Sequence, residues 1–121
     1  MSESSVPILL VEDDPLVLDT TAELLSDGGC EVRRCCNADE ALAALHEGPL
    51  PAVLVTDISL ASGRSGLDLA RMVAERWPQV RLLIVSGAAR PQREDYPEQA
   101  LFFTKPYAGG ALLAMVKRQD W

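Results

Sequence analysis

Apolar residues occur along the chain in short runs, and segments of helical periodicity lie between them. Four of the runs are continuous and rich in branched side chains, which is typical of strands that are buried on both faces of a parallel sheet. These runs are residues 8–11, 53–55, 82–85 and 101–103. A weaker run at residues 30–35 contains Glu31, Arg33 and Arg34 and therefore fits a strand at the edge of a sheet. The pattern predicts five strands.

Helical repeats occupy the segments between most of the predicted strands and the segment after the last one. They are residues 17–28, 37–45, 66–77 and 110–117. In the first segment, one helical face carries Val17, Thr21, Leu24 and Leu25. Asp14, directly before Pro15, is expected to cap this helix. Asn37 and Glu40 resemble a capping box at the start of the second helix, and Pro78 ends the third.

Strands that alternate with helix-length segments require crossover connections, and such connections produce a parallel sheet with helices on both faces. We therefore predict an α/β fold of the flavodoxin-like, doubly wound type, with five parallel strands in the order 2-1-3-4-5. Residues 1–121 are expected to form one domain with its core at about residues 6–118. Ligands of such sheets bind at the carboxyl ends of the strands where the strand order reverses, which here lies between the first and third strands.

The charge balance narrows the possible partners. The chain has 18 acidic and 11 basic side chains and a formal net charge of −7. A surface that binds nucleic acid or anionic lipid needs clustered Lys and Arg, so neither partner is expected. No apolar run approaches the roughly 20 residues of a membrane-spanning helix, and the N-terminal Met-Ser-Glu-Ser-Ser lacks signal-peptide character. Three cysteines without C-x-x-C spacing fit reduced thiols, so a cytoplasmic location is expected.

Chemically active side chains follow four of the predicted strands. They are Glu12, Asp13, Asp57, Ser86 and Lys105. Because parallel strands place their carboxyl ends at one edge, we expect the carboxylates to crowd together there, which is unfavourable unless a proton or a cation bridges them. Carboxylate oxygens suit Mg²⁺, and a lysine and a hydroxyl beside a metal can hold a phosphoryl group. An aspartate in such a place is a competent nucleophile toward phosphorus.

Four segments in this order resemble the receiver domain of the response regulators of two-component signalling systems, of the single-domain, chemotaxis-regulator-like type. The segments are residues 10–15 (Leu-Val-Glu-Asp-Asp-Pro), 56–60 (Thr-Asp-Ile-Ser-Leu), 86–87 (Ser-Gly) and 105–107 (Lys-Pro-Tyr). The resemblance covers about residues 6–118. It implies a phosphorylation-dependent switch rather than a metabolic enzyme. Asp57 would receive a phosphoryl group from a phosphohistidine of a sensor histidine kinase or phosphotransfer protein, and the domain would promote its own slow dephosphorylation.

The resemblance also implies a role for each residue at the strand ends. The expected ligands of Mg²⁺ are Asp13, Asp57, the backbone carbonyl of Ser59 and, through a water molecule, Glu12. Lys105 would pair with Asp57 and later with the phosphoryl oxygens, and the Ser86 hydroxyl would move toward a phosphoryl oxygen on activation. Phe102 matches the switch aromatic whose rotamer reports that movement. Strand alternation is expected to turn only one of Phe102 and Phe103 inward.

Two departures from the family pattern change the expectations. The family's proline four positions after the acceptor is Ala61 here, and its glycine, Gly66, follows Asp57 by nine positions instead of eight. The loop is therefore one residue longer, which is similar to receivers that are attached to, or serve, hybrid sensor kinases. The interval between the fourth and fifth strands is short and contains two prolines. We therefore expect the family's fourth helix to be short, displaced or disordered, and signalling to use another face.

Two other functions stay open from the sequence. A small phosphatase of the haloacid-dehalogenase type also uses an aspartate and Mg²⁺, but it needs a second aspartate two residues after the nucleophile, where this chain has Ser59. A pseudo-receiver that is not phosphorylated would act through protein contacts alone, and the presence of all five strand-end residues argues against it. For a receiver without an effector domain, the output is expected to be the binding of a partner protein or the onward transfer of phosphate.

Overall fold

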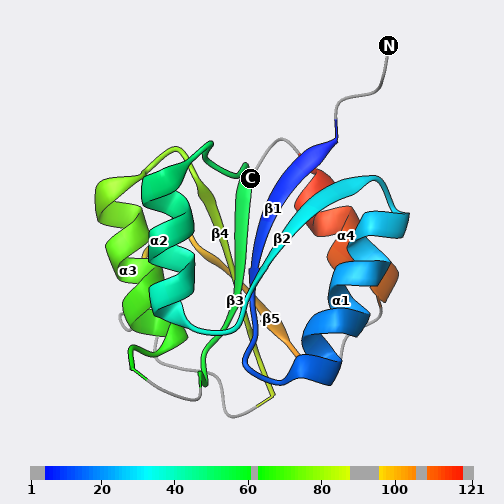
Figure 1. Cartoon of the computed structure of the whole chain (residues 1–121), viewed down its shortest axis with the longest axis horizontal. Coiled ribbons are helices and arrows are strands. Elements are labelled where there is room, and N and C mark those ends of the chain that lie inside the picture. Colours follow the sequence, from blue (N-terminus) through cyan, green and yellow to red (C-terminus); the bar gives the residue numbers. More distant parts are fainter. Residues whose placement is uncertain (1–4, 61–62, 88–95, 106–108, 119–121) are drawn as a thin grey trace.

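The computed structural model describes residues 5–60, 63–87, 96–105 and 109–118 and shows strands that alternate with helices (Figure 1). The strands are β1 (Val6–Val11), β2 (Cys30–Cys35), β3 (Val53–Asp57), β4 (Arg81–Ser86) and β5 (Leu101–Thr104). The helices are α1 (Pro15–Asp27), α2 (Ala38–Glu47), α3 (Gly66–Arg76) and α4 (Gly109–Lys117). The five strands and the four helices that were predicted from periodicity are all present. Their ends differ from the predicted ones by no more than two residues.

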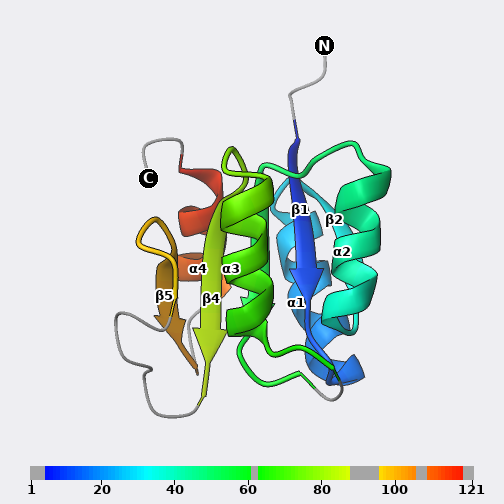
Figure 2. The same ribbon diagram turned by 90° about the vertical axis from the view of Figure 1, so that its left-hand side faces the viewer.

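The strands form one parallel sheet in the order β2-β1-β3-β4-β5. This order confirms the predicted flavodoxin-like, doubly wound topology. Helices α1 and α4 cover one face of the sheet, and α2 and α3 cover the other (Figure 1 and Figure 2). Strands β1 and β3 are parallel neighbours, so their carboxyl ends lie side by side. The strand order reverses between them, which makes this place the switch point of the sheet.

The sheet separates two apolar layers. Leu54 of β3 packs in the layer that contains α2 and α3, whereas its neighbour Val55 packs in the layer that contains α1 and α4. Both side chains are completely buried. Successive strand residues point to opposite faces, and here both faces are covered. This arrangement explains why the central strands are continuous apolar runs rather than alternating ones.

Strand β2 lies at one edge of the sheet and carries charged residues, as predicted. Arg33 donates a hydrogen bond to Glu47 of α2 at 2.8 Å, and Arg34 donates one to Asp19 of α1 at 3.1 Å. The two arginines are consecutive, so they point to opposite faces and each pairs with the helix on its own side. All four side chains are largely exposed, so solvent screens both pairs and they add little to stability. Their charges also oppose pairing of this edge with another chain.

Two polar residues cap the first two helices, as predicted. Asp14 Oδ1 accepts the N–H of Leu16 at 3.0 Å, and Pro15 is the first helical residue of α1. Asn37 Oδ1 accepts the N–H of Glu40 at 2.8 Å at the start of α2. Each cap satisfies a backbone donor that the helix itself leaves without an acceptor and typically contributes about 1 kcal/mol.

The predicted buried face of α1 was wrong by about one position. Leu18, Ala22 and Leu25 are the buried residues of α1, whereas Val17 and Leu24 are only half-buried. The sequence contains two overlapping stripes at helical spacing, and periodicity alone does not rank them. Packing against the sheet selects the stripe that has a small alanine between two leucines.

Strand β5 is less buried than its apolar run indicated, because it is the second edge of the sheet and pairs only with β4. The expectation that only one of Phe102 and Phe103 turns inward is also wrong. Phe102 packs against the α2/α3 layer and Phe103 against the α1/α4 layer, and each is half-buried. Alternation does send them to opposite faces, but both faces are covered.

The predicted short or irregular fourth helix falls mainly on residues 88–95, which lie outside the described residues. In the described part of this interval, Gly87 and residues 96–100 form no helix. The helix that follows β5, labelled α4, starts at Gly109.

Candidate functional site

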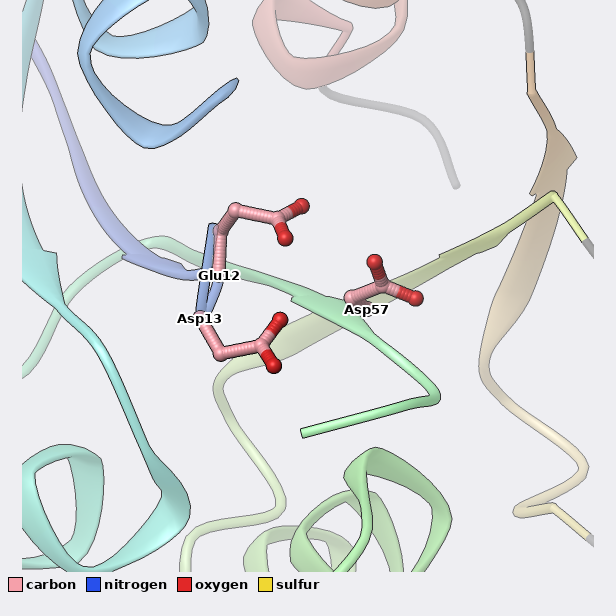
Figure 3. A group of neighbouring side chains, drawn as sticks. All are labelled: Glu12, Asp13 and Asp57. Atoms are coloured by element: carbon pink, nitrogen blue, oxygen red, sulfur yellow. The ribbon is translucent and has the colours of Figure 1, made fainter. Parts of the chain in front are cut away.

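Three carboxylates meet at the carboxyl ends of β1 and β3. Glu12 and Asp13 directly follow β1, and Asp57 is the last residue of β3. Their side chains point toward a common space (Figure 3). One oxygen from each carboxylate lies within 4.8 Å of the other two. The prediction that folding brings Asp13 and Asp57 into one site is confirmed.

Backbone hydrogen bonds between strand ends hold this arrangement in place. The N–H of Glu12 donates to the carbonyl of Cys35 at the end of β2 at 3.0 Å, and the N–H of Ile58 donates to the carbonyl of Val85 at 3.1 Å. The N–H of Lys105 donates to the carbonyl of Ser86 at 2.8 Å. The ends of β1, β3, β4 and β5 are therefore fixed relative to one another by the sheet itself.

Lys105 crosses the site and contacts two of the carboxylates. Its Nζ donates to Asp57 Oδ2 at 2.7 Å and to Glu12 Oε1 at 3.0 Å. The three side chains are largely buried, with exposed fractions of 23% for Lys105, 11% for Asp57 and 7% for Glu12. Charge-assisted hydrogen bonds of this kind are stronger than neutral ones. Lys105 supplies one positive charge against three carboxylates.

Burial and pairing shift the ionisation of two groups in the site. Burial raises the pKa of Glu12 above its ordinary value, and the hydrogen bonds from Lys105 and from the N–H of Asp14 offset only part of that rise. Burial alone would lower the pKa of Lys105, but its hydrogen bonds to Asp57 and Glu12 outweigh burial and raise it. Lys105 therefore stays charged at neutral pH, and the remaining excess of negative charge favours binding of a further cation.

The chemistry of this donor set fits a small, hard divalent cation. Carboxylate oxygens are the ligands that Mg²⁺ takes in proteins, usually with several waters retained. The three oxygens are close enough to share one ion. Asp57 Oδ1 also accepts the N–H of Ser59 at 3.3 Å, so the turn after β3 folds back toward the carboxylate. The ligand role that the sequence assigned to the Ser59 carbonyl stays a prediction.

The other two predicted site residues lie next to this cluster. Ser86 is the last residue of β4 and is 2% exposed, and its carbonyl accepts the N–H of Lys105. Phe102 lies on β5, and its ring centroid is 5.9 Å from that of Tyr96. Tyr96 is buried and was not singled out in the sequence. The switching roles of Ser86 and Phe102 stay predictions.

Gly66 has a structural role at the site that the sequence analysis did not assign. It begins α3 directly after the cap Ser65, and a Cβ built on it would lie 1.8 Å from the backbone oxygen of Asp57. No side chain fits there, so glycine is required by close approach. The signal was present as the glycine of the family pattern, displaced by one position.

Thr56 is the second residue that the sequence analysis did not assign a role. Its side chain is fully buried, and its hydroxyl donates to the carbonyl oxygen of Asp57 at 2.9 Å. A threonine at the end of an apolar strand is an ordinary β-branched residue in sequence, and only the structure reveals its polar contact.

Within residues 5–60, 63–87, 96–105 and 109–118, no helix has the length and apolar character needed to cross a bilayer.

The family model of the response regulator receiver domain matches residues 8–117. The chain belongs to this family. A solved receiver domain protein from Methanospirillum hungatei, described as CheY-like, is 28% identical, has a TM-score of 0.84 and aligns over 94% of this chain and 92% of its own. Receiver domains are the phosphorylation-dependent switches of two-component systems, and this assignment confirms the predicted resemblance.

The chain matches parts of longer curated relatives. The chain is 38% identical over 81 residues to the transcriptional activator protein ExaE of Pseudomonas putida. The aligned region covers 65% of this chain and 37% of ExaE. The chain is also 27% identical over 120 residues to the phyllosphere-induced regulator PhyR of Methylorubrum extorquens. That aligned region covers 97% of this chain and 44% of PhyR. The receiver domain described here therefore spans less than half the length of either relative.

Proposed function

We propose that this receiver domain accepts a phosphoryl group on Asp57 in an Mg²⁺-dependent reaction and thereby controls the binding of an output protein. The observation that carries the proposal is the position of the Asp57 carboxylate. It lies at the end of a central strand, bonded to Lys105, beside two further carboxylates. A buried aspartate beside a cation-binding cluster and a lysine has the groups that phosphoryl transfer requires.

The carboxylates of Asp13 and Asp57 would hold Mg²⁺ directly, and Glu12 would do so through water. The carbonyl of Ser59 would be a further ligand. When bound, Mg²⁺ neutralises part of the negative charge of the phosphoryl oxygens and of the acidic cluster. The donor set described above supports this proposal, because three oxygens within 4.8 Å of one another carry more negative charge than Lys105 offsets.

Phosphoryl transfer would begin with attack of an Asp57 carboxylate oxygen on phosphorus. The new O–P bond forms as the bond between phosphorus and one imidazole nitrogen of the donor breaks. The other ring nitrogen of the phosphohistidine would carry a proton, so the donor histidine leaves as neutral imidazole. The Lys105 ammonium and the Ser86 hydroxyl would then donate hydrogen bonds to the phosphoryl oxygens. Water would later attack the phosphorus of the acyl phosphate, which breaks the O–P bond, releases inorganic phosphate and restores the Asp57 carboxylate. The donor would be a sensor histidine kinase or a histidine phosphotransfer protein.

The same contacts offer a route from phosphorylation to output. Movement of Ser86 toward the phosphoryl group would change the end of β4, and Phe102 on the adjacent β5 would fill the space that this movement opens. Residue Ile84, two positions before Ser86, is paired with Phe102 in the sheet register. The output partner would bind a surface that Phe102 and its neighbour Tyr96 influence, and the receiver as a whole would act as a single switching unit.

Labelling with a small phosphodonor tests the proposal. Acetyl phosphate with Mg²⁺ should add one phosphoryl group to the wild type, as read by intact mass, and hydroxylamine should remove it because an acyl phosphate is electrophilic. Asp57→Asn should abolish labelling, and omission of Mg²⁺ should greatly reduce it. Asp19→Asn is a matched control, because Asp19 is exposed on α1 and pairs with Arg34. Equal labelling of Asp57→Asn would contradict the proposal, and an unlabelled wild type would support the pseudo-receiver alternative.

A further inference from the structure

Thr56 places a hydroxyl group inside an apolar part of the sheet. It is paired with Val11 of β1 on one side and with Ile84 of β4 on the other, and the side chains of both are buried. Thr56 itself has no exposed surface. Burial of a hydroxyl costs free energy unless it forms a hydrogen bond. This hydroxyl forms its bond with the backbone of the phosphoacceptor, because it donates to the carbonyl oxygen of Asp57 at 2.9 Å.

The Asp57 carbonyl lies where the pairing between β1 and β3 ends. The last pair of that ladder is Val11 with Thr56, so Asp57 is one position beyond it. Glu12, the next residue of the first strand, directs its N–H to the carbonyl of Cys35 in β2 instead. At this point the Thr56 hydroxyl supplies a donor to the Asp57 carbonyl.

The peptide unit between Asp57 and Ile58 is held on its other sides as well. Its N–H donates to the carbonyl of Val85 at 3.1 Å, and its oxygen faces Gly66 so closely that a Cβ there would lie 1.8 Å away. The direction of a side chain follows from the backbone that carries it. A fixed peptide therefore fixes where the Asp57 carboxylate points.

We infer that Thr56 is a positioning residue, whose hydroxyl fixes the Asp57–Ile58 peptide and so aligns the Asp57 carboxylate with Lys105 and the cation site. The inference deepens the proposed function and rests on it. It assigns to the hydroxyl a role beyond filling the core, since a β-branched apolar residue would fill the same volume. Loss of the hydroxyl leaves the buried carbonyl without this donor. The hydrogen bond to Val85 and the contact with Gly66 then hold the peptide without it, so the carboxylate is aligned less strictly.

The test compares three variants at a temperature at which circular dichroism shows each of them folded. Thr56→Val keeps the shape and removes the hydroxyl, and Thr56→Ser keeps the hydroxyl and removes the methyl group. Leu54→Ala is the control, because Leu54 is two residues earlier on the same strand and the same face and is fully buried. The measurements are the initial rate of labelling by acetyl phosphate at saturating Mg²⁺, the dissociation constant of Mg²⁺ by calorimetry, and the urea midpoint.

Thr56→Val should slow labelling by roughly fivefold to tenfold, as expected for the loss of one hydrogen bond that aligns a reacting group. It should also raise the dissociation constant of Mg²⁺. Thr56→Ser should stay within about twofold of the wild type. Leu54→Ala should lose more stability, because it opens a cavity, yet label at the wild-type rate. If Thr56→Val does not fold, Thr56→Ala against Thr56→Ser gives the same comparison.

Wild-type labelling by Thr56→Val would overturn the inference, as would an equal loss in Thr56→Ser or in Leu54→Ala. Failure of the proposed function is distinguishable from this, because the wild type itself would then remain unlabelled. In that case the Mg²⁺ titration alone tests the role of Thr56. We expect a larger dissociation constant of Mg²⁺ for Thr56→Val than for the wild type, and an unchanged dissociation constant would overturn the inference.

Discussion

Lys105 carries the positive charge that allows Glu12 and Asp57 to lie close together in a largely buried site. Its raised pKa means that the folded state holds the ammonium proton more tightly than the unfolded chain does, so its stabilising contribution is present below about pH 10.5 and is lost as the pH rises through its folded pKa. The pKa of Glu12 is also raised. The contribution of Glu12 to stability is therefore fully present below its ordinary pKa of 4.5 and is lost as the pH rises through its pKa in the folded state.

Replacement of Lys105 by Met should make stability depend more strongly on pH. Without the ammonium, nothing in the lysine's place offsets the repulsion between Glu12 and Asp57. Urea unfolding in EDTA should show a loss of about 2 kcal/mol at pH 7.5, of the size of a hydrogen bond to a charged group, and a smaller loss at pH 5, where Glu12 more readily takes up a proton. Mg²⁺ should recover part of the loss at pH 7.5.

The control for this change is Lys117→Met. Lys117 Nζ donates to the carbonyl of Gly28 at 2.9 Å, at the junction of α1 and α4 and away from the acidic cluster. The effect of its removal should not respond to Mg²⁺ and should be the same at both pH values. A Lys105→Met variant that behaves in this way would show that the lysine does not balance the charge of the cluster.

At the scale of elements, the start of α3 is set by the contact of Gly66 with the backbone of Asp57. Gly66→Ala should destabilise the domain by about 3 kcal/mol or shift α3 away from the site, because the methyl group would overlap backbone atoms that cannot move aside. Gly110→Ala is the matched control, since it lies near the start of α4 with nothing within 4 Å of an added Cβ. It should be neutral or stabilise by about 0.5–1 kcal/mol. Equal urea midpoints for the two variants would contradict the close-packing account.

The elements whose signals are local could be predicted from the sequence. Strand β2 and the capped start of α2 are examples, because charge at an edge and an Asn cap are written in neighbouring residues. The burial of α1 and β5 could not be predicted in this way. The α1 face was decided by contact with the sheet, and β5 became an edge because of the strand order, which no residue within β5 specifies. Tertiary packing decides between patterns that periodicity leaves equal.

The candidate site shows the same division. Its members Asp13, Asp57 and Lys105 could be predicted because parallel strands bring their carboxyl ends to one edge. The contact of Lys105 with Glu12 and the hydroxyl bond of Thr56 could not, since both depend on atomic positions across strands. Gly66 was noted in the sequence for its position in the family pattern, but its close approach to the backbone of Asp57 could not be predicted, because that contact depends on how α3 packs against the end of β3.

At the scale of the whole molecule, the acidic cluster and the first turn of α1 form one rim. Strand β1 leads through Glu12 and Asp13 directly into α1, and Leu16 stands in the first turn of that helix with an exposed fraction of 75%. Among the described residues, Leu16 is the one large apolar residue whose side chain is strongly exposed. If Asp57 accepts phosphate as proposed, a protein donor that brings a phosphohistidine to it would have to cover this rim, whereas acetyl phosphate would be small enough to reach the carboxylate without doing so.

Leu16→Ser should therefore separate the two phosphodonors. Burial of a leucine side chain in an interface contributes about 1.5–3 kcal/mol, so transfer from a phosphorylated sensor kinase that labels the wild type should slow by about tenfold or more. Labelling by acetyl phosphate should stay at the wild-type rate, because the Leu16 side chain is exposed and does not belong to the carboxylate cluster of Glu12, Asp13 and Asp57. The substitution is on the surface and should change the urea midpoint little. Equal slowing with both donors would indicate damage to the site, and unchanged transfer from the kinase would mean that the donor approaches Asp57 from another side of the rim.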